Sequence, residues 1–328
     1  MLAARIHEDG GPEVLVVEEV PDPVAGPGEV LVRLEAASLN HLDVWVRKGL
    51  PSVPKPRILG ADGAGVVEAL GDGVTGPAVG DRVVLNPGVE HGDRITVVGE
   101  HFDGTHAELI AIDAAQVFPL DDGLSFEVAA AFPLVFETAH RMLVTRASVR
   151  EGEWALIWGI GGGVATAAFE ICRALGLRTI VTSGSDGKLE QAQSWGADVV
   201  VNHHDGDVVA AVKEATGKGV DVVVETVGDA TWARTLAAVR PTGRVVVCGA
   251  TSGPNPPAQL HRFWWKQLTV LGSSMGTRED FLGAYEMVRT GRVRVHVDRV
   301  FPLSEIRAAH ERLEAGEQLG KIVLEIPG

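Results

Sequence analysis

Residues 154–176 place the strongest constraint on how this chain can fold. An apolar run at residues 154–158 leads into a cluster of glycines and then, without a polar spacer, into Ala- and Ile-rich sequence with helical spacing. This order predicts strand, tight turn and helix, because glycine adopts positive φ and lets the backbone lie against a ligand. The first amide groups of the helix favour a negative charge, so the turn is suited to a phosphate or pyrophosphate.

The glycine cluster does not reproduce a G-x-G-x-x-G spacing with glycine at every position. The best register puts Ile160, Gly162 and Ala165 at the three positions, and the third accepts alanine because it serves close packing of helix on strand. Taken alone, the cluster is also compatible with an ordinary tight turn. The backbone contacts that we predict for a nucleotide come from Gly159, Ile160, Gly161, Gly162, Gly163 and Val164.

Composition limits the partners of the chain. Its 328 residues are 45% apolar and 22% charged, which allows two domains with real cores. The net charge of -15 repels nucleic acid and anionic lipid, so neither is expected as a partner. The first residues contain no signal-peptide core and no apolar run approaches a membrane span, so we expect a cytoplasmic protein.

The pattern of strands changes near residue 150. Residues 1 to about 120 contain short alternating or apolar runs separated by Gly, Pro and Asp, which predicts a compact antiparallel, barrel-like domain. Residues 124–149, with Ser125 as N-cap, predict a pair of helices. Apolar strands then recur without polar alternation, which indicates a parallel sheet covered on both faces. We expect these strands at residues 178–183, 197–202, 220–226, 243–250 and 268–274.

The tail from about Arg278 returns to mixed structure. It predicts a helix at 279–291, a strand at 295–303, a helix at 304–316 and a final strand at 320–326. The predicted domains are therefore residues 1–123, residues 124–267, and residues 268–328 as the last strand of the parallel sheet and a return to the first domain.

Several motifs in order resemble the medium-chain dehydrogenase/reductase superfamily, and within it the quinone oxidoreductase-like and zinc-type alcohol dehydrogenase-like group. The resemblance covers nearly the whole chain. Its markers are the segments 28–32 (GEVLV), 40–43 (NHLD), 60–67 (GADGAGVV), 80–83 (GDRV), the glycine turn, 196–198 (GAD), 227–228 (VG) and 320–324 (GKIVL). It implies a GroES-like β-barrel catalytic domain interrupted by a Rossmann domain, and a homodimer formed through the last Rossmann strand, residues 268–274.

The resemblance also indicates whether the chain keeps the zinc ligands of its zinc-dependent relatives. Zinc-dependent relatives place a cysteine near the position of Asn40 and a His-Glu pair at the position of Ala61 and Asp62, so a thiolate and an imidazole are lost here. Two cysteines in the chain exclude a four-thiolate site. We therefore predict no metal. Histidines and acids crowd residues 90–106, and a makeshift metal site there is the alternative to a solvated polar loop.

The end of the second Rossmann strand predicts the cofactor. An NAD enzyme would place a carboxylate there, but Ser183, Gly184 and Ser185 are small and neutral, which favours NADP(H). Ser183, Ser185 and Lys188 can donate to a 2′-phosphate, although Lys188 is equally typical of a solvated helix start, and Asp186 would favour NAD if it turned inward. In similar reductases a lysine at the position of Lys188 and an aromatic residue at the position of His203 flank that phosphate, so His203 is a predicted cofactor contact that departs from the usual tyrosine. The other cofactor contacts expected by position are Val227, Gly228, Gly249, Ala250, Ser273, Ser274 and Met275.

Without a Lewis acid, hydride transfer needs an acceptor activated by conjugation, such as a quinone or an α,β-unsaturated carbonyl. The predicted catalytic residues are Asn40, whose amide can donate to a carbonyl oxygen, Asp43 and Asp62; each is also compatible with a purely structural role in a loop. No His, Tyr or Lys stands out in the sequence as a proton donor. We expect an NADPH-dependent, zinc-independent reductase of small molecules. The alternatives are an alcohol or aldehyde dehydrogenase with an unconventional metal site, and a non-catalytic NADPH-binding protein.

Overall fold

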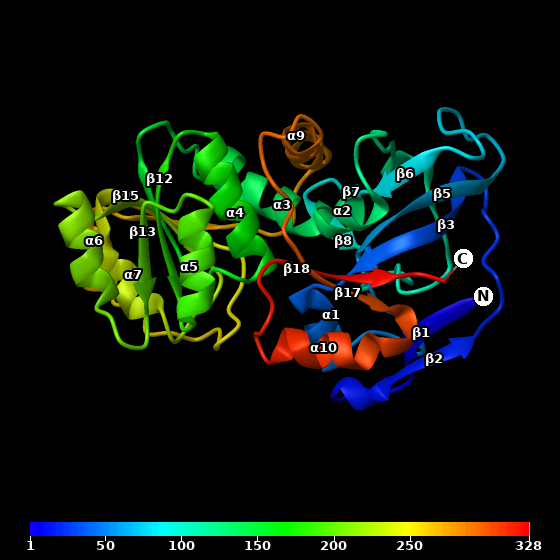
Figure 1. Cartoon of the computed structure of the whole chain (residues 1–328), viewed down its shortest axis with the longest axis horizontal. Coiled ribbons are helices and arrows are strands. Elements are labelled where there is room, and N and C mark those ends of the chain that lie inside the picture. Colours follow the sequence, from blue (N-terminus) through cyan, green and yellow to red (C-terminus); the bar gives the residue numbers. More distant parts are fainter. Residues whose placement is uncertain (328) are drawn as a thin grey trace. The chain divides into compact units, whose positions relative to one another are not determined.

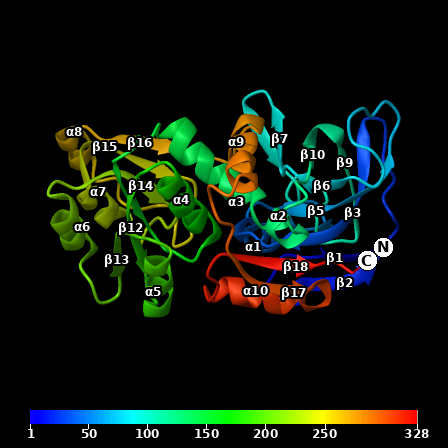
Figure 2. The same ribbon diagram turned by 45° about the horizontal axis from the view of Figure 1, so that its top comes forward.

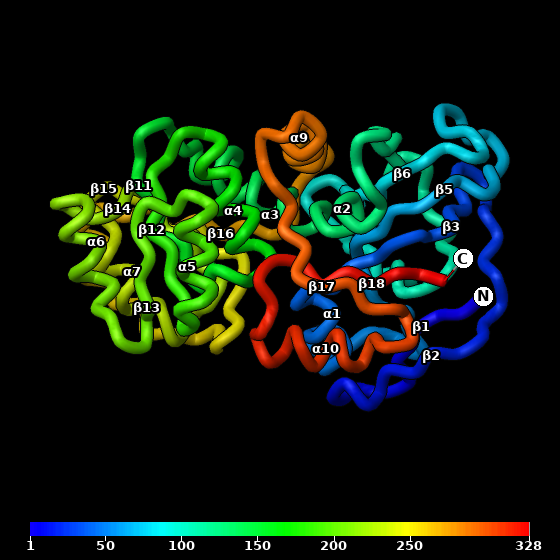
Figure 3. Tube along the Cα trace, viewed as in Figure 1, coloured from blue at the N-terminus to red at the C-terminus, as the bar shows by residue number. Residues whose placement is uncertain are grey.

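The computed structural model describes residues 1–327, and the chain divides into two compact units. Unit 1 contains Met1–Leu134, Thr277–Gly291 and the residues from Val295 onward, and unit 2 contains Val135–Gly276 and Arg292–Arg294. Figure 3 follows this path, with the last strand in red returning beside the blue N-terminal strands of unit 1. The predicted boundary at residue 123 precedes helix α2 (Phe126–Ala131), which contacts β3 and β5 in unit 1.

Unit 1 is built on a mainly antiparallel sheet with the strand order β10-β6-β5-β3-β18-β17, and β9 also pairs with β3. The burial of β3 alternates along most of its length, so one face packs into the core through Val30, Val32 and Leu34. A smaller sheet has the order β2-β1-β4, and β7 and β8 form a hairpin. The strands are β1 (Leu2–Ile6), β2 (Leu15–Glu19), β3 (Glu29–Ser38), β4 (Arg57–Ile58), β5 (Asp62–Leu70), β6 (Arg82–Leu85), β7 (Gly88–His91), β8 (Arg94–Val97), β9 (Leu109–Asp113), β10 (Val117–Pro119), β17 (Val297–Pro302) and β18 (Lys321–Glu325).

The helices of unit 1 include both helices predicted in the tail. They are α1 (His41–Arg47), α2, α9 (Arg278–Arg289) and α10 (Ile306–Glu314), with 3₁₀ turns at Pro12–Val14, Ala114–Gln116 and Leu303–Glu305. The Ser125 hydroxyl accepts from Val128 N at 3.4 Å, which confirms the predicted N-cap of α2. The predicted helix pair continues as α3 (Pro133–His140), followed by a π-helical segment at Arg141–Arg146.

Unit 2 is organised around a parallel sheet with the order β13-β12-β11-β14-β15-β16 (Figure 2). All the strands predicted for this region are present, and β15 begins earlier than expected, at Val239. Helices α4 and α5 lie on one face of the sheet and α6 and α7 on the other (Figure 1). The elements are β11 (Trp154–Ile157), α4 (Gly163–Ala174), β12 (Arg178–Ser183), α5 (Asp186–Ser194), β13 (Val199–Asn202), α6 (Val208–Thr216), β14 (Val220–Glu225), α7 (Trp232–Ala238), β15 (Val239–Val247), α8 (Leu260–Lys266) and β16 (Thr269–Gly272).

The order of these strands fixes where a ligand can bind in unit 2. The chain starts in the middle at β11, goes outward through β12 and β13, and then crosses to the other side of β11 to add β14, β15 and β16. In such a sheet, loops that follow neighbouring strands separate at the point where the direction reverses, and ligands bind there beyond the carboxyl ends of the strands.

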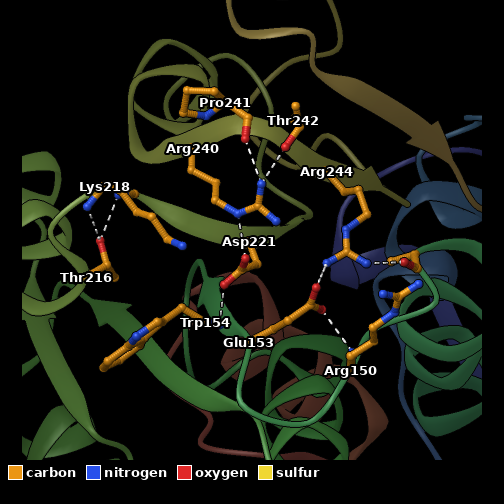
Figure 4. Close-up of polar contacts among 12 residues, drawn as sticks. Arg150, Glu153, Trp154, Thr216, Lys218, Asp221, Arg240, Pro241, Thr242 and Arg244 are labelled. Atoms are coloured by element: carbon orange, nitrogen blue, oxygen red, sulfur yellow. Dashed lines mark hydrogen bonds and ion pairs between the residues drawn. The ribbon is translucent and has the colours of Figure 1, made fainter.

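Charged side chains link the opposite, amino-terminal edge of this sheet (Figure 4). Asp221, near the start of β14, accepts from Trp154 N at 2.8 Å and from Arg240 Nε at 2.6 Å. Glu153 forms an ion pair with Arg244 at 2.6 Å. Although burial raises the pKa of the Asp221 carboxyl, the donors from Trp154 and Arg240 outweigh it and lower that pKa overall. The hydrogen bonds and the ion pair at this edge therefore stabilise the unit 2 sheet.

Within residues 1–327, no helix combines the length and the apolar character that a bilayer crossing requires.

Candidate functional site

The structure brings the residues predicted to bind a cofactor to one edge of the unit 2 sheet. They follow the carboxyl ends of β11, β12, β14, β15 and β16, and the turn after β13 adds His203. Because parallel strands end at the same edge, segments separated by more than a hundred residues in sequence meet there. Spacing along the sequence alone could not place these segments side by side, because their proximity depends on the strand order.

The turn after β11 has the geometry expected of a phosphate-binding loop. Gly159 has φ +68° and Gly161 has φ +124°, values that other residues rarely adopt. A Cβ added at Gly159 would have no neighbour within 4 Å, and one at Gly162 would meet only the Gly159 carbonyl oxygen at 3.7 Å. Open space therefore lies over the backbone where α4 begins at Gly163, followed by Val164. A pyrophosphate fits such a cradle at a helix N-terminus.

The glycine turn is attached to the end of β12. Ile160 N donates to the Thr182 carbonyl oxygen at 2.7 Å, and Gly159 N donates to Thr182 Oγ1 at 3.2 Å. Ala165, at the third fingerprint position, is buried. The turn is therefore held by hydrogen bonds to the backbone and side chain of Thr182, which makes it preorganised for a ligand.

The segment after β12 carries the residues predicted near a ribose phosphate. Ser183 is buried and its hydroxyl accepts from Ser185 N at 3.1 Å. Lys188 lies half-buried in the first turn of α5. The carboxylate of Asp186 accepts from Asn202 Nδ2 at 2.7 Å, which ties it to the end of β13.

A buried carboxylate, Glu225, holds the loop after β14 and is not among the residues predicted from the sequence. Glu225 Oε1 accepts from Val227 N at 2.9 Å and from Gly228 N at 3.1 Å. Its Oε2 accepts from Thr235 Oγ1 at 2.5 Å, and that hydroxyl accepts from Trp158 Nε1 at 2.7 Å. Glu225 thus connects the predicted cofactor loop Val227–Gly228 to the residue that precedes the glycine turn. A Glu at the end of an otherwise apolar strand is the signal that could have identified it.

The loops after β15 and β16 complete this edge. Gly249 and Ala250 are half-buried, and the loop is joined to that after β14 by Ser252 N donating to the Val227 carbonyl oxygen at 2.8 Å. Ser273 N donates to the Val247 carbonyl oxygen at 2.9 Å. The remaining predicted residues follow directly, with Ser274 exposed and Met275 buried at φ +49°.

In unit 1, the side chains of two of the three predicted catalytic residues contact each other. Asn40 Nδ2 donates to Asp62 Oδ2 at 2.9 Å. The ammonium of Lys321 donates to Asn40 Oδ1 at 2.6 Å and to Asp62 Oδ2 at 3.0 Å. Asn40, Asp62 and Lys321 are all at least nine-tenths buried. We call these three residues the polar triad.

Lys321 lies beside two of the predicted catalytic residues, although no lysine stood out in the sequence as a proton donor. Strand register explains the contact, because Asp62 lies opposite Ser38 in the β3–β5 pair and Val323 lies opposite Ser38 in the β3–β18 pair. Lys321 begins β18 and so reaches the residues just past the end of β3. The closing motif GKIVL contains this lysine, but its distance of 281 residues from Asn40 concealed the contact.

The orientation of the Asn40 amide follows from the charges around it. Its oxygen meets the ammonium and one of its N–H groups meets the carboxylate. The reversed amide would place N–H against ammonium and oxygen against carboxylate, so it is disfavoured. The second N–H of Nδ2 is left to donate to another acceptor.

Asp43, the third predicted catalytic residue, contacts backbone only. Its Oδ2 accepts from Asn40 N at 2.7 Å and its Oδ1 accepts from Gly60 N at 2.9 Å. Burial raises the pKa of this carboxyl, against the lowering effect of His106 and of the two backbone donors. The geometry favours the structural alternative, in which Asp43 fixes the segments that carry Asn40 and Asp62.

A second buried polar group lies in unit 1 around His106 and His310. Their rings are 6.3 Å apart, and His310 Nδ1 is 3.0 Å from Nη1 of the fully buried Arg47. Arg47 also pairs with Glu314. Burial lowers the pKa of His106, and burial together with His106 and Arg47 lowers the pKa of His310 well below its ordinary value. Both imidazoles are therefore neutral at pH 7.

The histidines and acids of residues 90–106 are used for other contacts. His101 Nδ1 accepts from Val97 N at 3.1 Å, Asp103 accepts from Ile58 N at 3.0 Å, and Glu90 accepts from Arg278 N at 2.6 Å. Within residues 1–327, no three His, Cys, Asp or Glu side chains are grouped so that they could hold a metal ion.

Tyr285 has a structural role in unit 1. Its hydroxyl donates to the Pro119 carbonyl oxygen at 2.7 Å and accepts from Asp121 N at 3.0 Å. Its ring stacks on Phe132 with the centroids 5.4 Å apart. These contacts fix Tyr285 between residues 119–121 and the ring of Phe132.

Two family models match the chain. Residues 26–122 match "Alcohol dehydrogenase GroES-like domain" and residues 163–290 match "Zinc-binding dehydrogenase". A quinone oxidoreductase of Pseudomonas aeruginosa is 34% identical, covering 96% of this chain and 96% of that protein. These matches confirm the expected pairing of a GroES-like domain with a Rossmann domain.

Solved structures agree with this fold. The crystal structure of an NAD-dependent alcohol dehydrogenase has a TM-score of 0.96 and 41% identity, covering 100% of both chains. A mycobacterial protein, Rv1454c, crystallised with NADPH, has a TM-score of 0.88 and 30% identity, covering 99% of both chains. One of these proteins is thus NAD-dependent and the other is bound to NADPH.

Proposed function

Because the chain belongs to the medium-chain dehydrogenase/reductase superfamily, we propose that it is a zinc-independent, NADPH-dependent oxidoreductase that reduces quinones or α,β-unsaturated carbonyls. The observation that carries this proposal is the polar triad. Its donor set suits a substrate oxygen and does not suit a metal ion.

The chemistry of the polar triad argues against zinc. Zinc prefers thiolate and imidazole ligands, whereas this position offers an amide and one carboxylate. The Lys321 ammonium already binds both the Asn40 amide oxygen and the Asp62 carboxylate, so a divalent cation would have to displace it. The residues present do not fit zinc, and we derive no step through a metal.

The edge of the unit 2 sheet fits a nicotinamide dinucleotide, which when bound would supply the hydride. The open space over Gly159 and Gly162 accepts the pyrophosphate. Ser183, Gly184 and Ser185 provide no carboxylate for a ribose hydroxyl, and Asp186 is held by Asn202. These features support NADPH over NADH.

The polar triad supplies the polar groups for reduction of a conjugated carbonyl. As the carbonyl oxygen gains negative charge, the unused N–H of Asn40 donates a hydrogen bond to it. Lys321 and Asp62 hold the amide in the donating orientation, and Asp43 fixes the backbone of Asn40. The proton that completes the product comes from water.

Replacing Asn40 by Ala tests this role directly. We expect kcat with a quinone or enone to fall about 10²- to 10³-fold, the usual effect of losing one oxyanion donor. The dissociation constant for NADPH should stay unchanged, because Asn40 lies in the other unit from the glycine turn. Rate assays and calorimetry measure the two quantities, and a parallel loss of cofactor binding would contradict the assignment.

A substrate panel with metal analysis separates the alternatives. Consumption of NADPH with quinones or enones, by protein without metal, is the expected result. One tightly held zinc per chain whose removal abolishes turnover would favour an alcohol or aldehyde dehydrogenase with an unconventional metal site. Tight NADPH binding without turnover of any quinone, enone or aldehyde would favour a non-catalytic binding protein.

We also propose a homodimer formed through β16. This strand lies at the edge of the unit 2 sheet, where unpaired backbone groups can continue the sheet into a second copy. Val270 is 42% exposed, and Trp264 and Trp265 on the adjacent α8 are 67% and 84% exposed. Large exposed aromatics are typical of an interface. The expected cytoplasmic location stays a prediction.

A further inference from the structure

We propose that His203 and His204 form a pH-sensitive selector for the 2′-phosphate of NADPH. The inference rests on the proposed nicotinamide site and names the two imidazoles that would make it prefer the phosphorylated cofactor more strongly as the pH falls.

Strand pairing places both imidazoles at the end of β12. Ser183 lies opposite Asn202 in the β12–β13 pair, and His203 N donates to the Ser183 carbonyl oxygen at 3.0 Å. The turn that follows β13 therefore lies beside the end of β12. In a sheet of this strand order, that position receives the ribose next to the adenine, whose 2′ group distinguishes the two cofactors.

Both rings direct a nitrogen at Gly184. A Cβ built on Gly184 would lie 2.4 Å from His204 Nε2 and 3.4 Å from His203 Nε2. The φ of Gly184 is not positive, so glycine is needed here for space rather than for backbone conformation. The two rings are 4.8 Å apart and inclined at 64°. They thus present two Nε2 atoms to one small region beside Ser183.

Neither ring is used in the fold. Among residues 1–327, no side-chain hydrogen bond or ion pair reaches either imidazole, and the buried Nδ1 of His203 has no partner. The Nε2 atoms, which face Gly184, are the nitrogens that a ligand can reach. These rings are therefore available to a ligand.

The charges around the pair favour an anion. From α7, Arg234 Nη1 donates to the His203 carbonyl oxygen at 3.4 Å, and α5 contributes Lys188 in its first turn. The acids nearby are Asp186, which Asn202 holds, and Asp205 in the same turn as the histidines. Burial, together with His204 and Arg234, lowers the pKa of His203, which favours its neutral imidazole in the free protein.

Binding of a phosphate dianion shifts the protonation equilibrium of the two imidazoles. Its charge favours the imidazolium form, so binding of the 2′-phosphate is accompanied by uptake of a proton, whereas binding of NADH is not. An imidazolium donates to a phosphate oxygen with a charge-assisted hydrogen bond. Preference for NADPH over NADH should therefore increase as pH falls toward 6.5.

Calorimetry with nucleotide fragments tests the pair without any turnover. The probes are 2′,5′-ADP and 5′-AMP, titrated between pH 8 and pH 6.5, above the second pKa of the phosphate at about 6. We expect the affinity for 2′,5′-ADP to rise about tenfold over this range, with proton uptake seen as a dependence on buffer ionisation enthalpy. The affinity for 5′-AMP should stay constant.

The double variant His203→Gln/His204→Gln keeps amide donors but removes the charge. We expect it to lose the pH dependence and the proton uptake, while its affinity for 5′-AMP stays at the wild-type value. His91→Gln, an exposed imidazole in unit 1, is the matched control and should behave as wild type.

A double variant that keeps the wild-type pH slope and proton uptake would overturn the inference and leave the proposed function standing. A wild-type protein that binds neither fragment and neither NADPH nor NADH would instead overturn the proposed function, and the inference with it.

Discussion

The Asn40 amide meets opposite charges at its two ends, and this determines what its neighbours contribute. The ammonium of Lys321 and the carboxylate of Asp62 are both buried and form an ion pair, so each compensates the charge of the other. Removing only one of the two charges should therefore lower the stability of the fold. Removing Lys321 or Asp62 should also free the Asn40 amide to rotate.

Lys321→Met tests both effects. We expect the free energy of unfolding to fall by about 3–5 kcal/mol, because Asp62 becomes an uncompensated buried charge. Turnover should also fall, because Asn40 can rotate. Urea denaturation and rate assays measure the two effects.

The double variant Lys321→Met/Asp62→Asn is the informative companion. It removes both charges, so stability should recover while turnover stays low. Recovery of turnover along with stability would show that Lys321 acts only on folding. Lys321→Arg, which keeps the charge, should retain more activity than Lys321→Met.

At the scale of the element, β14 carries two carboxylates, one near each end of the strand, and they have different roles. Asp221 joins neighbouring strands at the amino-terminal edge (Figure 4), and Glu225 holds the loop at the carboxyl edge. Both stabilise unit 2, but only Glu225 lies where we expect the cofactor.

Replacing each carboxylate by its amide separates these tasks. Both Asp221→Asn and Glu225→Gln should lower the free energy of unfolding by about 1–3 kcal/mol, since buried hydrogen bonds are lost. Only Glu225→Gln should weaken NADPH binding, because its amide cannot accept from Val227 N, Gly228 N and Thr235 at once. Equal NADPH affinity in both variants, measured by calorimetry, would remove Glu225 from the cofactor site.

At the scale of the whole molecule, unfolding should depend on pH through the buried histidines. His106 and His310 have lowered pKa values in the folded protein, whereas unfolded histidine titrates near 6.5. Below pH 6.5 the unfolded chain binds more protons, so stability falls as the pH falls, by up to about 1.4 kcal/mol per pH unit for each histidine.

Urea denaturation between pH 8 and pH 5 measures this slope. His310→Gln should reduce it by removing one of the titrating groups, although the variant starts from a lower stability at pH 8. An unchanged slope in this variant would show that other groups control acid unfolding.

Assembly offers a further prediction at this scale. Val270→Lys places a charge on the exposed edge strand β16 and should convert the proposed dimer to a monomer in sedimentation analysis. Val300→Lys is the matched control, because Val300 is 43% exposed on β17, the edge strand of the unit 1 sheet. Identical sedimentation of both variants and wild type would exclude a β16 interface.

The sequence by itself determined the features that depend on neighbouring residues. Glycines at positive φ, an apolar run before them and helical spacing after them are local properties, so the turn at residues 159–163 and the strands of unit 2 could be predicted. The family followed from motifs in order along the chain.

Only the tertiary structure decided which distant side chains meet. Lys321 reaches Asn40 because β18 pairs with β3, and His204 faces Gly184 because β13 pairs with β12. Glu225 is recognised by the donors that converge on it from a loop and a helix. Strand pairing joins residues far apart in sequence, and no local pattern records that register, which is why these three side chains were missed.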